Sequence, residues 1–375
     1  MAMSEAEELR RAVRDFLEVT SPAARVRELM ATDRGYSDAV WRQMAGELGL
    51  HGIAAPESVG GAGAGMAELA VVFEEMGAAL LCAPFFSTVG LAMQAVLAGG
   101  DPAAMDDFLP GLVDGSSTAT LILNGRLDAW DPEAVSLTAD ADETGHRITG
   151  DAELVLDGHT ADLVLVAAST AAGMSMFAVS ADAQGLTRQP LATLDRTRKV
   201  ARLRFDQVPA RLIGPDGGAE AALARAADLA MVALAAEQVG AAQRCLDMAV
   251  GYAKERIQFG RAIGSFQAVK HRCADMLVLV EGARSAVVHA AEVADTEELP
   301  VAASVAKMAC SEAFLQVALD NMRIHGGIGF TWEHDAHLYV RRAKATALMF
   351  GSPDYHAQRL AALVPSSLHQ PKGRS

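Results

Sequence analysis

Cysteine, aromatic residues and positive charge are all scarce in this chain of 375 residues. The four cysteines are scattered without C-x-x-C spacing, which argues against a disulfide framework or a zinc knuckle and fits a reducing cytoplasm. Lys and Arg number 32 against 47 Asp and Glu, a net charge of −15. We therefore expect no general binder of nucleic acid or anionic membrane, because phosphate binding needs cations clustered over a wide face.

Long apolar segments are also missing. The first twenty residues alternate charged and apolar side chains at helical spacing, which predicts a helix and not a signal peptide. The apolar run at 229–236 is bracketed by Asp228 and Glu237 and is too short to cross a bilayer. We expect a cytoplasmic protein without a membrane span.

Common nucleotide and metal motifs are absent as well. The glycine-rich stretch 60–65 lacks the last glycine of G-x-G-x-x-G and follows a Pro-Glu-Ser turn, which makes a dinucleotide Rossmann site unlikely on these residues. Glu333, His334 and His337 in "EHDAH" do not have the spacing of a known zinc motif. We predict no metal site.

The hydrophobic periodicity changes twice along the chain. Residues 1–115 have helical spacing, 116–213 contain short apolar runs between turns, and 214–365 return to a period near 3.6. A doubly wound sheet would alternate strands and helices throughout. We predict an α+β fold with a helical N-terminal domain, a central antiparallel β-domain, a C-terminal bundle of four or five helices, and a disordered tail at 366–375.

Two loops interrupt the helices of the last region. One reads Arg-x-x-Phe-Gly at 256–260 with Phe266 and Gln267 shortly after it, and the other is the stretch from Arg323 to Ala345. Each loop contains a glycine, which lets a ligand come close to the backbone, and also an Arg or amide side chain that can bind a phosphate or the edge of a heterocycle. Helix C-caps with solvated charges are the competing interpretation, which two such loops in one domain weaken.

These loops, with Ala-Asp-Met at 274–276 and "APESVGGAGAG" at 55–65, resemble the acyl-CoA dehydrogenase family. Its members are flavoproteins that oxidise acyl-CoA thioesters to 2-enoyl-CoA. The resemblance implies a helical domain, a β-domain and a C-terminal four-helix bundle, and FAD whose adenosine-diphosphate part is held across a subunit interface. It assigns that contact to Arg256, Gln258, Phe259, Phe266, Gln267, Arg323, Ile324, His325, Gly326 and Gly327.

Partners follow from the same resemblance. It implies an acyl-CoA substrate, an electron-transfer flavoprotein or similar acceptor, and a homo-oligomer or a hetero-oligomer with a homologous chain. Loops that contact a neighbour's flavin have no use in a monomer.

The catalytic base is the main departure from the family pattern. Many members carry it as the Glu of a Tyr-Glu-Gly-Thr turn, where this chain has Gly351 or a deletion, and a second family position is Ala230 here. Glu237 lies two helical turns after Ala230, on roughly the same face. A carboxylate in an Ala-rich buried helix is costly unless it is paired or used. We predict Glu237 as the base, with a salt bridge or a flavin-side hydrogen bond as alternatives and Asp354 as the next candidate.

The strands depart too. Where members carry Thr-Glu-Pro and Trp-Ile-Thr segments against the flavin ring, this chain has "LILNGRL" and Leu154, Val155 and Leu156, and Arg323 replaces a usual glutamine. Three hypotheses stay open: an active enzyme that uses Glu237, a non-catalytic partner subunit of a mixed tetramer such as some bacterial members form, and a related flavoprotein with altered chemistry.

Overall fold

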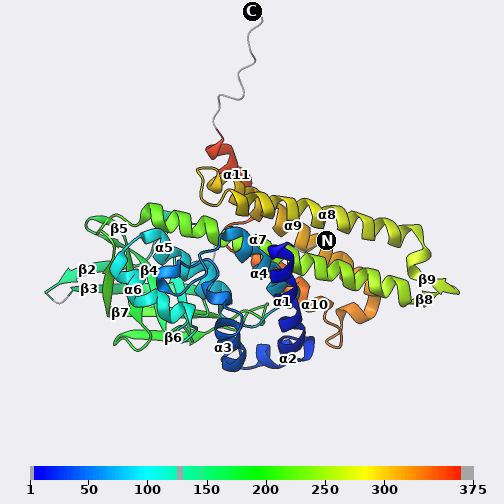
Figure 1. Ribbon diagram of the computed structural model, residues 1–375, viewed down its shortest axis with the longest axis horizontal. Helices are drawn as coiled ribbons and strands as arrows, with labels where there is room; N and C mark the ends of the chain where they lie inside the picture. Colours follow the sequence, from blue (N-terminus) through cyan, green and yellow to red (C-terminus); the bar gives the residue numbers. More distant parts are fainter. Residues whose placement is uncertain (1–3, 125–129, 144, 365–375) are drawn as a thin grey trace, which may run out of the picture.

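Helices, then strands, then helices follow one another along the chain, as the sequence predicts. The computed structural model describes residues 4–124, 130–143 and 145–364, so the tail predicted at 366–375 lies outside the described residues. Figure 1 shows the β-domain at one end of the molecule and long helices that run from it toward the opposite end. The α+β class with a central β-domain is confirmed.

Short helices build the N-terminal region. The first begins at a capping box, in which Ser4 and Glu7 each accept a hydrogen bond from the other's backbone N–H, with three acidic residues in its first turn. The helices are α1 (Glu5–Thr20), α2 (Ala23–Ala31), α3 (Asp38–Gly46), η1 (Leu50–Gly52), η2 (Glu57–Val59), α4 (Met66–Ala78), the π-helix η3 (Phe86–Ala92), α5 (Met93–Gly99) and α6 (Pro102–Val113).

The β-domain closes on itself. Pairings β4–β2, β2–β3, β3–β7, β7–β5 and β5–β4 form a ring, with β1 beside β4 and β6 beside β7. Most pairs are antiparallel, but β1 and β2 each run parallel to β4, so the prediction of an antiparallel domain is wrong for these two pairings. The elements are β1 (Ala119–Ile122), η4 (Pro132–Ala134), β2 (Thr138–Asp142), β3 (Gly145–Leu156), β4 (Leu163–Thr170), β5 (Gly173–Ser180), β6 (Leu186–Pro190) and β7 (Val200–Ile213).

Five α-helices, two short 3₁₀-helices and a small hairpin make up the C-terminal region. Helices α7, α8 and α9 are the long ones, and α10 and α11 pack against α9. The elements are α7 (Glu220–Glu255), β8 (Ile257–Gln258), β9 (Arg261–Ala262), η5 (Ile263–Ser265), α8 (Gln267–Glu292), α9 (Leu299–His325), η6 (Gly326–Phe330), α10 (Ala336–Leu348) and α11 (Pro353–Leu363).

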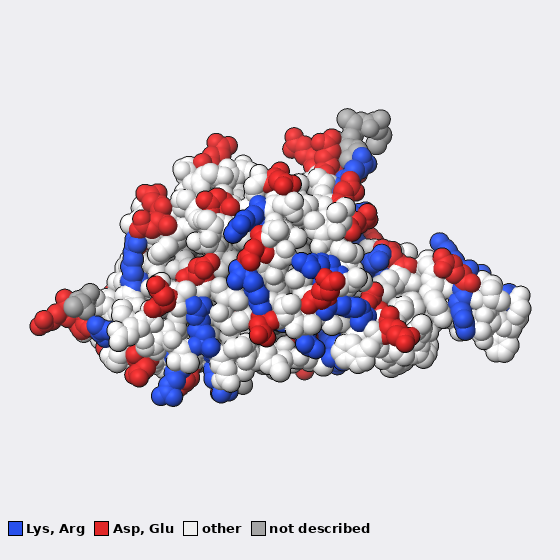
Figure 2. All heavy atoms as spheres, turned by 90° about the horizontal axis from the view of Figure 1, so that it is seen from below, with Lys and Arg blue, Asp and Glu red and all other residues white. Residues whose placement is uncertain are grey.

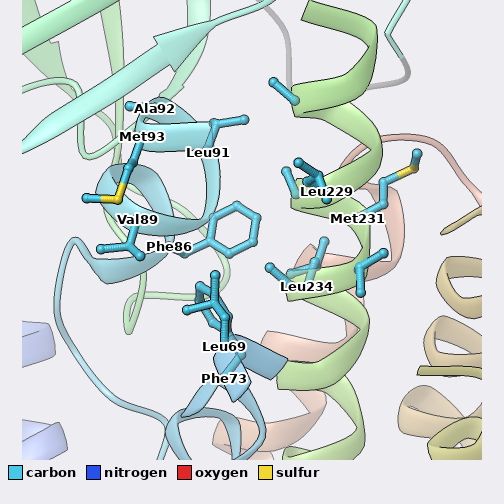
Figure 3. Close-up of a cluster of buried hydrophobic side chains, with 14 of the residues drawn as sticks. Leu69, Phe73, Phe86, Val89, Leu91, Ala92, Met93, Leu229, Met231 and Leu234 are labelled. Carbon is cyan, nitrogen blue, oxygen red and sulfur yellow. The ribbon is translucent and has the colours of Figure 1, made fainter. Parts of the chain in front are cut away.

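Helix α7 is the core of the molecule. Every residue from Ala226 to Ala242 is buried, and a helix that is apolar on all sides needs neighbours on all sides. Helices α4, α8 and α9 pack along it. In Figure 3, Leu229 and Leu234 of α7 lie on the side that faces Phe86 of η3 and Phe73 of α4. The N-terminal and C-terminal helices therefore share one hydrophobic core.

Two glycines let α4 and α7 cross in backbone contact. A methyl group on Gly77 would overlap the backbone of Glu237, and one on Gly240 would overlap the backbone of Glu74. Helices that have larger residues at such a crossing pack with their axes about 8–10 Å apart. The position of Glu237 relative to α4 is thus set by the two glycines.

Helix α9 with its 3₁₀ extension, Leu299–Phe330, is the one described helix that is long and apolar enough to cross a membrane. Of its most apolar window, 61% is buried inside the protein. Core helices pass the same test of length and composition, so this is weak evidence for a membrane span.

Gly240→Ala should destabilise the protein by about 1–3 kcal/mol, because the added methyl must push α4 away from α7. Gly251→Ala in the same helix is the matched control, since open space surrounds that glycine and alanine favours a helix by about 0.5–1 kcal/mol. Urea unfolding of both variants measures the difference. Equal stabilities of the two variants would contradict the close crossing.

Candidate functional site

The first predicted cofactor loop lies at the end of α7 that is far from the β-domain (Figure 1). Arg256 ends the helix, and the chain turns back through β8 and β9. Phe259 occupies the turn with a φ of 51° and is 92% exposed. Its ring meets Phe266 edge-on at 6.1 Å between centroids, and the Arg261 guanidinium lies 4.2 Å from the centroid of Phe266.

Helix α8 begins after this hairpin and the short 3₁₀ helix η5. Gln267 is its first residue, its first turn has no acidic residue, and Lys270, His271 and Arg272 follow. The N-terminus of a helix attracts phosphate through its free N–H groups and its dipole. Among the described residues no carboxylate pairs with Arg256. The loop has the donors that a pyrophosphate requires.

The second predicted loop lies beside the first. His325, at the end of α9, stacks on Tyr252 of α7 at 4.4 Å between ring centroids, and its Nδ1 donates to the carbonyl of Asn321. Gly326 and Gly327 follow, exposed and with open space around them. Arg323 is half exposed and paired with Asp320 at 2.9 Å. The structure therefore brings the two predicted loops together at one end of the bundle, where Ile324 is partly buried against the hydrophobic core.

Glu237 is remote from both loops. Nineteen residues of α7 separate it from Arg256, which is about 28 Å at 1.5 Å per residue. The loops of one chain therefore do not surround the predicted base of the same chain.

Glu237 itself lies inside an ion-pair network and is 4% exposed. One carboxylate oxygen accepts from Arg198 and the other from Arg342, and Arg342 also pairs with Asp195 at 2.6 Å. Arg342 donates further to Thr197. The network joins α7, α10 and the segment between β6 and β7.

The network determines the charge of Glu237. Burial opposes ionisation, but Arg198 and Arg342 outweigh it and hold the pKa of the carboxyl below its ordinary value. A base for an α-proton needs a raised pKa and a free oxygen. In this structure Glu237 has neither, so the salt-bridge alternative describes it. The geometry gives no support to the prediction that Glu237 is the base.

The other base positions offer no buried carboxylate. Gly351 has a φ of 106°, and a Cβ there would overlap the ring of Tyr355. Ala230 is fully buried. Asp354 is exposed in the first turn of α11.

Apolar side chains occupy the strand ends at which the family resemblance expects contacts to a flavin ring. Leu123, Val155 and Leu156 are buried, and Leu154 is 38% exposed. Leu123 and Leu156 belong to the main core cluster. Gly125 and the residues that follow it in "LILNGRL" lie outside the described residues. Leu123, Leu154, Val155 and Leu156 carry no polar side-chain atom that could form a hydrogen bond with a flavin ring.

Sequence reasoning missed the partners of Glu237. Asp195, Thr197 and Arg198 lie in a segment read as a turn, and Arg342 in one read as part of a cofactor loop. A buried acid in an apolar helix does signal that a cation must face it. The sequence does not show which of the 32 Lys and Arg residues does so.

A cavity of about 870 Å³ opens elsewhere, between α1, α4, α7 and α8. Three of its arginines are paired with acids: Arg10 lies 2.8 Å from Glu74 and 3.0 Å from Glu75, Arg14 lies 2.8 Å from Glu75, and Arg284 pairs with Glu74. Figure 2 likewise shows basic and acidic side chains interspersed on one face of the molecule. No group of three or more His, Cys, Asp or Glu among the described residues is placed to hold a metal ion.

Comparison with known proteins gives the family. The profile of the acyl-CoA dehydrogenase N-terminal domain matches residues 3–116 and that of the C-terminal domain matches 216–364. Acyl-CoA dehydrogenase IpdE2 of Mycobacterium tuberculosis is 37% identical over 95% of this chain and 96% of its own length. Its namesake in Mycolicibacterium smegmatis is 36% identical over 96% of this chain and all of its own.

Solved structures agree. A chain of the Tcur3481-Tcur3483 steroid ACAD superposes with a TM-score of 0.86 at 34% identity, over 98% of this chain and 99% of that one. A chain of the ChsE4-ChsE5 complex of Mycobacterium tuberculosis gives 0.88 at 29% identity, over 99% of both chains. This protein belongs to the acyl-CoA dehydrogenase family, whose members are FAD-dependent oxidoreductases.

Glu237→Gln should cost about 3–5 kcal/mol of stability at pH 7, because it breaks a buried ion pair and leaves cations without a full counter-charge. A lowered folded-state pKa means that this contribution is present above the unfolded value of 4.5 and is lost as pH falls below it. The difference from wild type in denaturant unfolding should therefore shrink below pH 4.5. Glu281→Gln, at an exposed glutamate 3.6 Å from Arg284, is the control and should change stability by less than about 1 kcal/mol.

Proposed function

We propose that this chain is a subunit of a heteromeric FAD-dependent acyl-CoA dehydrogenase, in which it completes the flavin site of a neighbouring chain and does not supply the catalytic base. The observation that carries the proposal is that none of the positions considered for the catalytic base has a free buried carboxylate. Glu237 has both oxygens on arginines, and Gly351 has no side chain. An enzyme that removes an α-proton needs a carboxylate from another chain.

The loops at the far end of α7 support the other half of the proposal. Arg256 would neutralise phosphate, Gln258 and Gln267 would meet the edge of a ring, and the free N–H groups at the start of α8 would hold a pyrophosphate oxygen. FAD, when bound, supplies the hydride acceptor of the reaction. Phe259 and Phe330, 92% and 67% exposed, gain cover only when another chain brings its cofactor to this end.

One face of α8 also supports an assembly. Leu277, Val278 and Val288 are 48%, 71% and 50% exposed on this helix. Exposed apolar side chains on a long helix are typical of a subunit interface. The names Tcur3481-Tcur3483 and ChsE4-ChsE5 describe relatives that are assemblies of two different chains. We propose a homologous chain as the partner here.

The substrate, the electron acceptor and the cellular location are proposed from the related proteins alone. The steroid ACAD among the relatives supports the CoA thioester of a ring-bearing acid over a straight-chain one. An electron-transfer flavoprotein or similar protein is the proposed acceptor, and the cytoplasm the proposed location.

A mixing experiment tests the role of the chain. Alone, it should not bleach flavin with any acyl-CoA, and it should do so after co-expression with a homologous chain that carries a carboxylate at the family position. Anaerobic absorbance at the flavin band, with straight-chain and steroid-derived CoA thioesters, is the measurement. Bleaching by the chain alone would overturn the partner role, and loss of that bleaching in Glu237→Gln would restore Glu237 as the base.

Arg256→Ala should weaken FAD binding by the assembly roughly 10- to 150-fold, which corresponds to about 1.5–3 kcal/mol for charge-assisted hydrogen bonds. Fluorescence titration of the apo-assembly with FAD gives the dissociation constant. Arg202→Ala, at an exposed arginine of β7, is the control and should leave it unchanged. Equal constants for the two variants would remove Arg256 from the site.

A further inference from the structure

The second predicted loop has little packing of its own. Of the residues of η6, Gly326–Phe330, only Gly329 is buried. Ile328 and Phe330 are 44% and 67% exposed, and a methyl group on Gly326 or Gly327 would meet open space. Adjacent glycines leave a chain much conformational freedom, and ordering them costs free energy. The conformation of this loop therefore depends on what holds its two ends.

Two histidines close the loop at its base. His325 precedes it and His334 follows it, and their ring centroids lie 4.2 Å apart. Each ring is oriented by a hydrogen bond to the nearby backbone. Nδ1 of His325 donates to the carbonyl of Asn321 at 2.9 Å, and Nδ1 of His334 accepts from the N–H of Ala336 at 3.1 Å. The contact between the rings thus brings the start and the end of the loop together.

Tyr252 of α7 holds the first histidine. Its ring stacks on that of His325, with 4.4 Å between the centroids and 30° between the planes. Among the described residues the Tyr252 hydroxyl has no hydrogen-bond partner, so Tyr252 acts on His325 through its ring. Aromatic pairs stabilise a structure beyond the area that they bury. Helix α7 thereby fixes the start of the loop.

Arg27 of α2 holds the second histidine. Its guanidinium donates to the carbonyl oxygen of His334 at 3.0 Å and to the carboxylate of Asp335 at 2.7 Å. Hydrogen bonds that involve a charged group are roughly twice as strong as those between neutral groups. A helix of the N-terminal region therefore fixes the end of the loop.

We propose that Tyr252 and Arg27 are positioning residues of the flavin site. Through the two histidines they hold the loop at 326–330 ready for the adenosine-diphosphate part of FAD. The inference rests on the proposed function and adds to it two residues that lie outside both predicted loops. A loop that is ordered before binding loses less conformational entropy when the ligand arrives, which raises the affinity.

Tyr252→Leu should weaken FAD binding by the assembly roughly 2- to 12-fold, the range that one aromatic pair contributes. Tyr252→Phe keeps the ring and should bind FAD as wild type does. Fluorescence titration of the apo-assembly with FAD gives the three dissociation constants. Unchanged affinity in Tyr252→Leu would remove Tyr252 from the proposal. Equal weakening in both variants would show that the hydroxyl, and not the stacked ring, matters, which also contradicts the positioning role.

Arg27→Met should weaken FAD binding as well, although the substitution lies in α2. Arg25→Met is the matched control, because Arg25 lies on the same helix and pairs at its surface with Glu28, 2.8 Å away. It should bind FAD as wild type does. Urea unfolding of both variants checks that each chain folds. Equal dissociation constants for the two variants would show that Arg27 does not position the loop.

Hydrogen exchange of the chain by itself tests the positioning without FAD. The N–H of Gly326 donates to the carbonyl of Arg323 and that of Thr331 to the carbonyl of Ile328, so both amides report on the loop. Both should exchange faster in Tyr252→Leu and Arg27→Met than in wild type, while the amides at 229–236 in the core keep their protection. Unchanged exchange at both amides would overturn the proposal.

The same measurements separate this inference from the proposed function. A wild-type assembly that binds no FAD would overturn the proposed function itself. A wild-type assembly that binds FAD, with variants that bind it equally well, would overturn only the positioning role of Tyr252 and Arg27.

Discussion

The ion pair of Glu237 and Arg342 is the constraint on which the arrangement of this molecule depends. Both side chains are almost fully buried, and each loses its hydration in a core made mainly of alanine and leucine. A buried pair of this kind is strongly destabilising when one partner is removed. The pair therefore fixes the position of α10 relative to α7. Because Arg342 also pairs with Asp195, the segment between β6 and β7 is fixed relative to both helices.

A second polar network lies next to the first and uses the adjacent residue of α7. Gln238 donates to Ser311 of α9 and Thr346 of α10, at 3.2 and 3.1 Å. Ser311 leads to Lys307 and from there to the turn after α10. Apolar packing among small side chains specifies helix positions weakly, because alanine surfaces slide past one another at little cost. Directional hydrogen bonds from neighbouring positions of one helix supply the missing specificity.

The parts of this protein that sequence patterns describe well are local. Periodicity locates the long helices, because one face or all faces of each are apolar, and the Arg-x-x-Phe-Gly and His-Gly-Gly stretches mark where α7 and α9 end. Pairings between distant segments escape such reasoning. The parallel contact of β1 with β4 and the choice of Arg342 and Arg198 for Glu237 depend on which surfaces meet in three dimensions. Glu237 stands out in the sequence because a buried carboxylate is energetically costly. Burial alone, however, does not distinguish a carboxylate that reacts from one that is neutralised by a cation.

The length of α7 has a consequence for how this chain changes over time. Its buried half is fixed in the core by Glu237 and Gly240, and its far end carries Arg256, which meets another chain in the proposed assembly. Each inserted or deleted residue between them would rotate that end by about 100° and shift it by about 1.5 Å. The shortest step that nearly restores the direction is about seven residues, two turns of helix, and it displaces the end by about 10 Å. In the proposed assembly, substitutions in this stretch of α7 can therefore accumulate, whereas insertions and deletions would misplace Arg256 relative to the neighbouring chain.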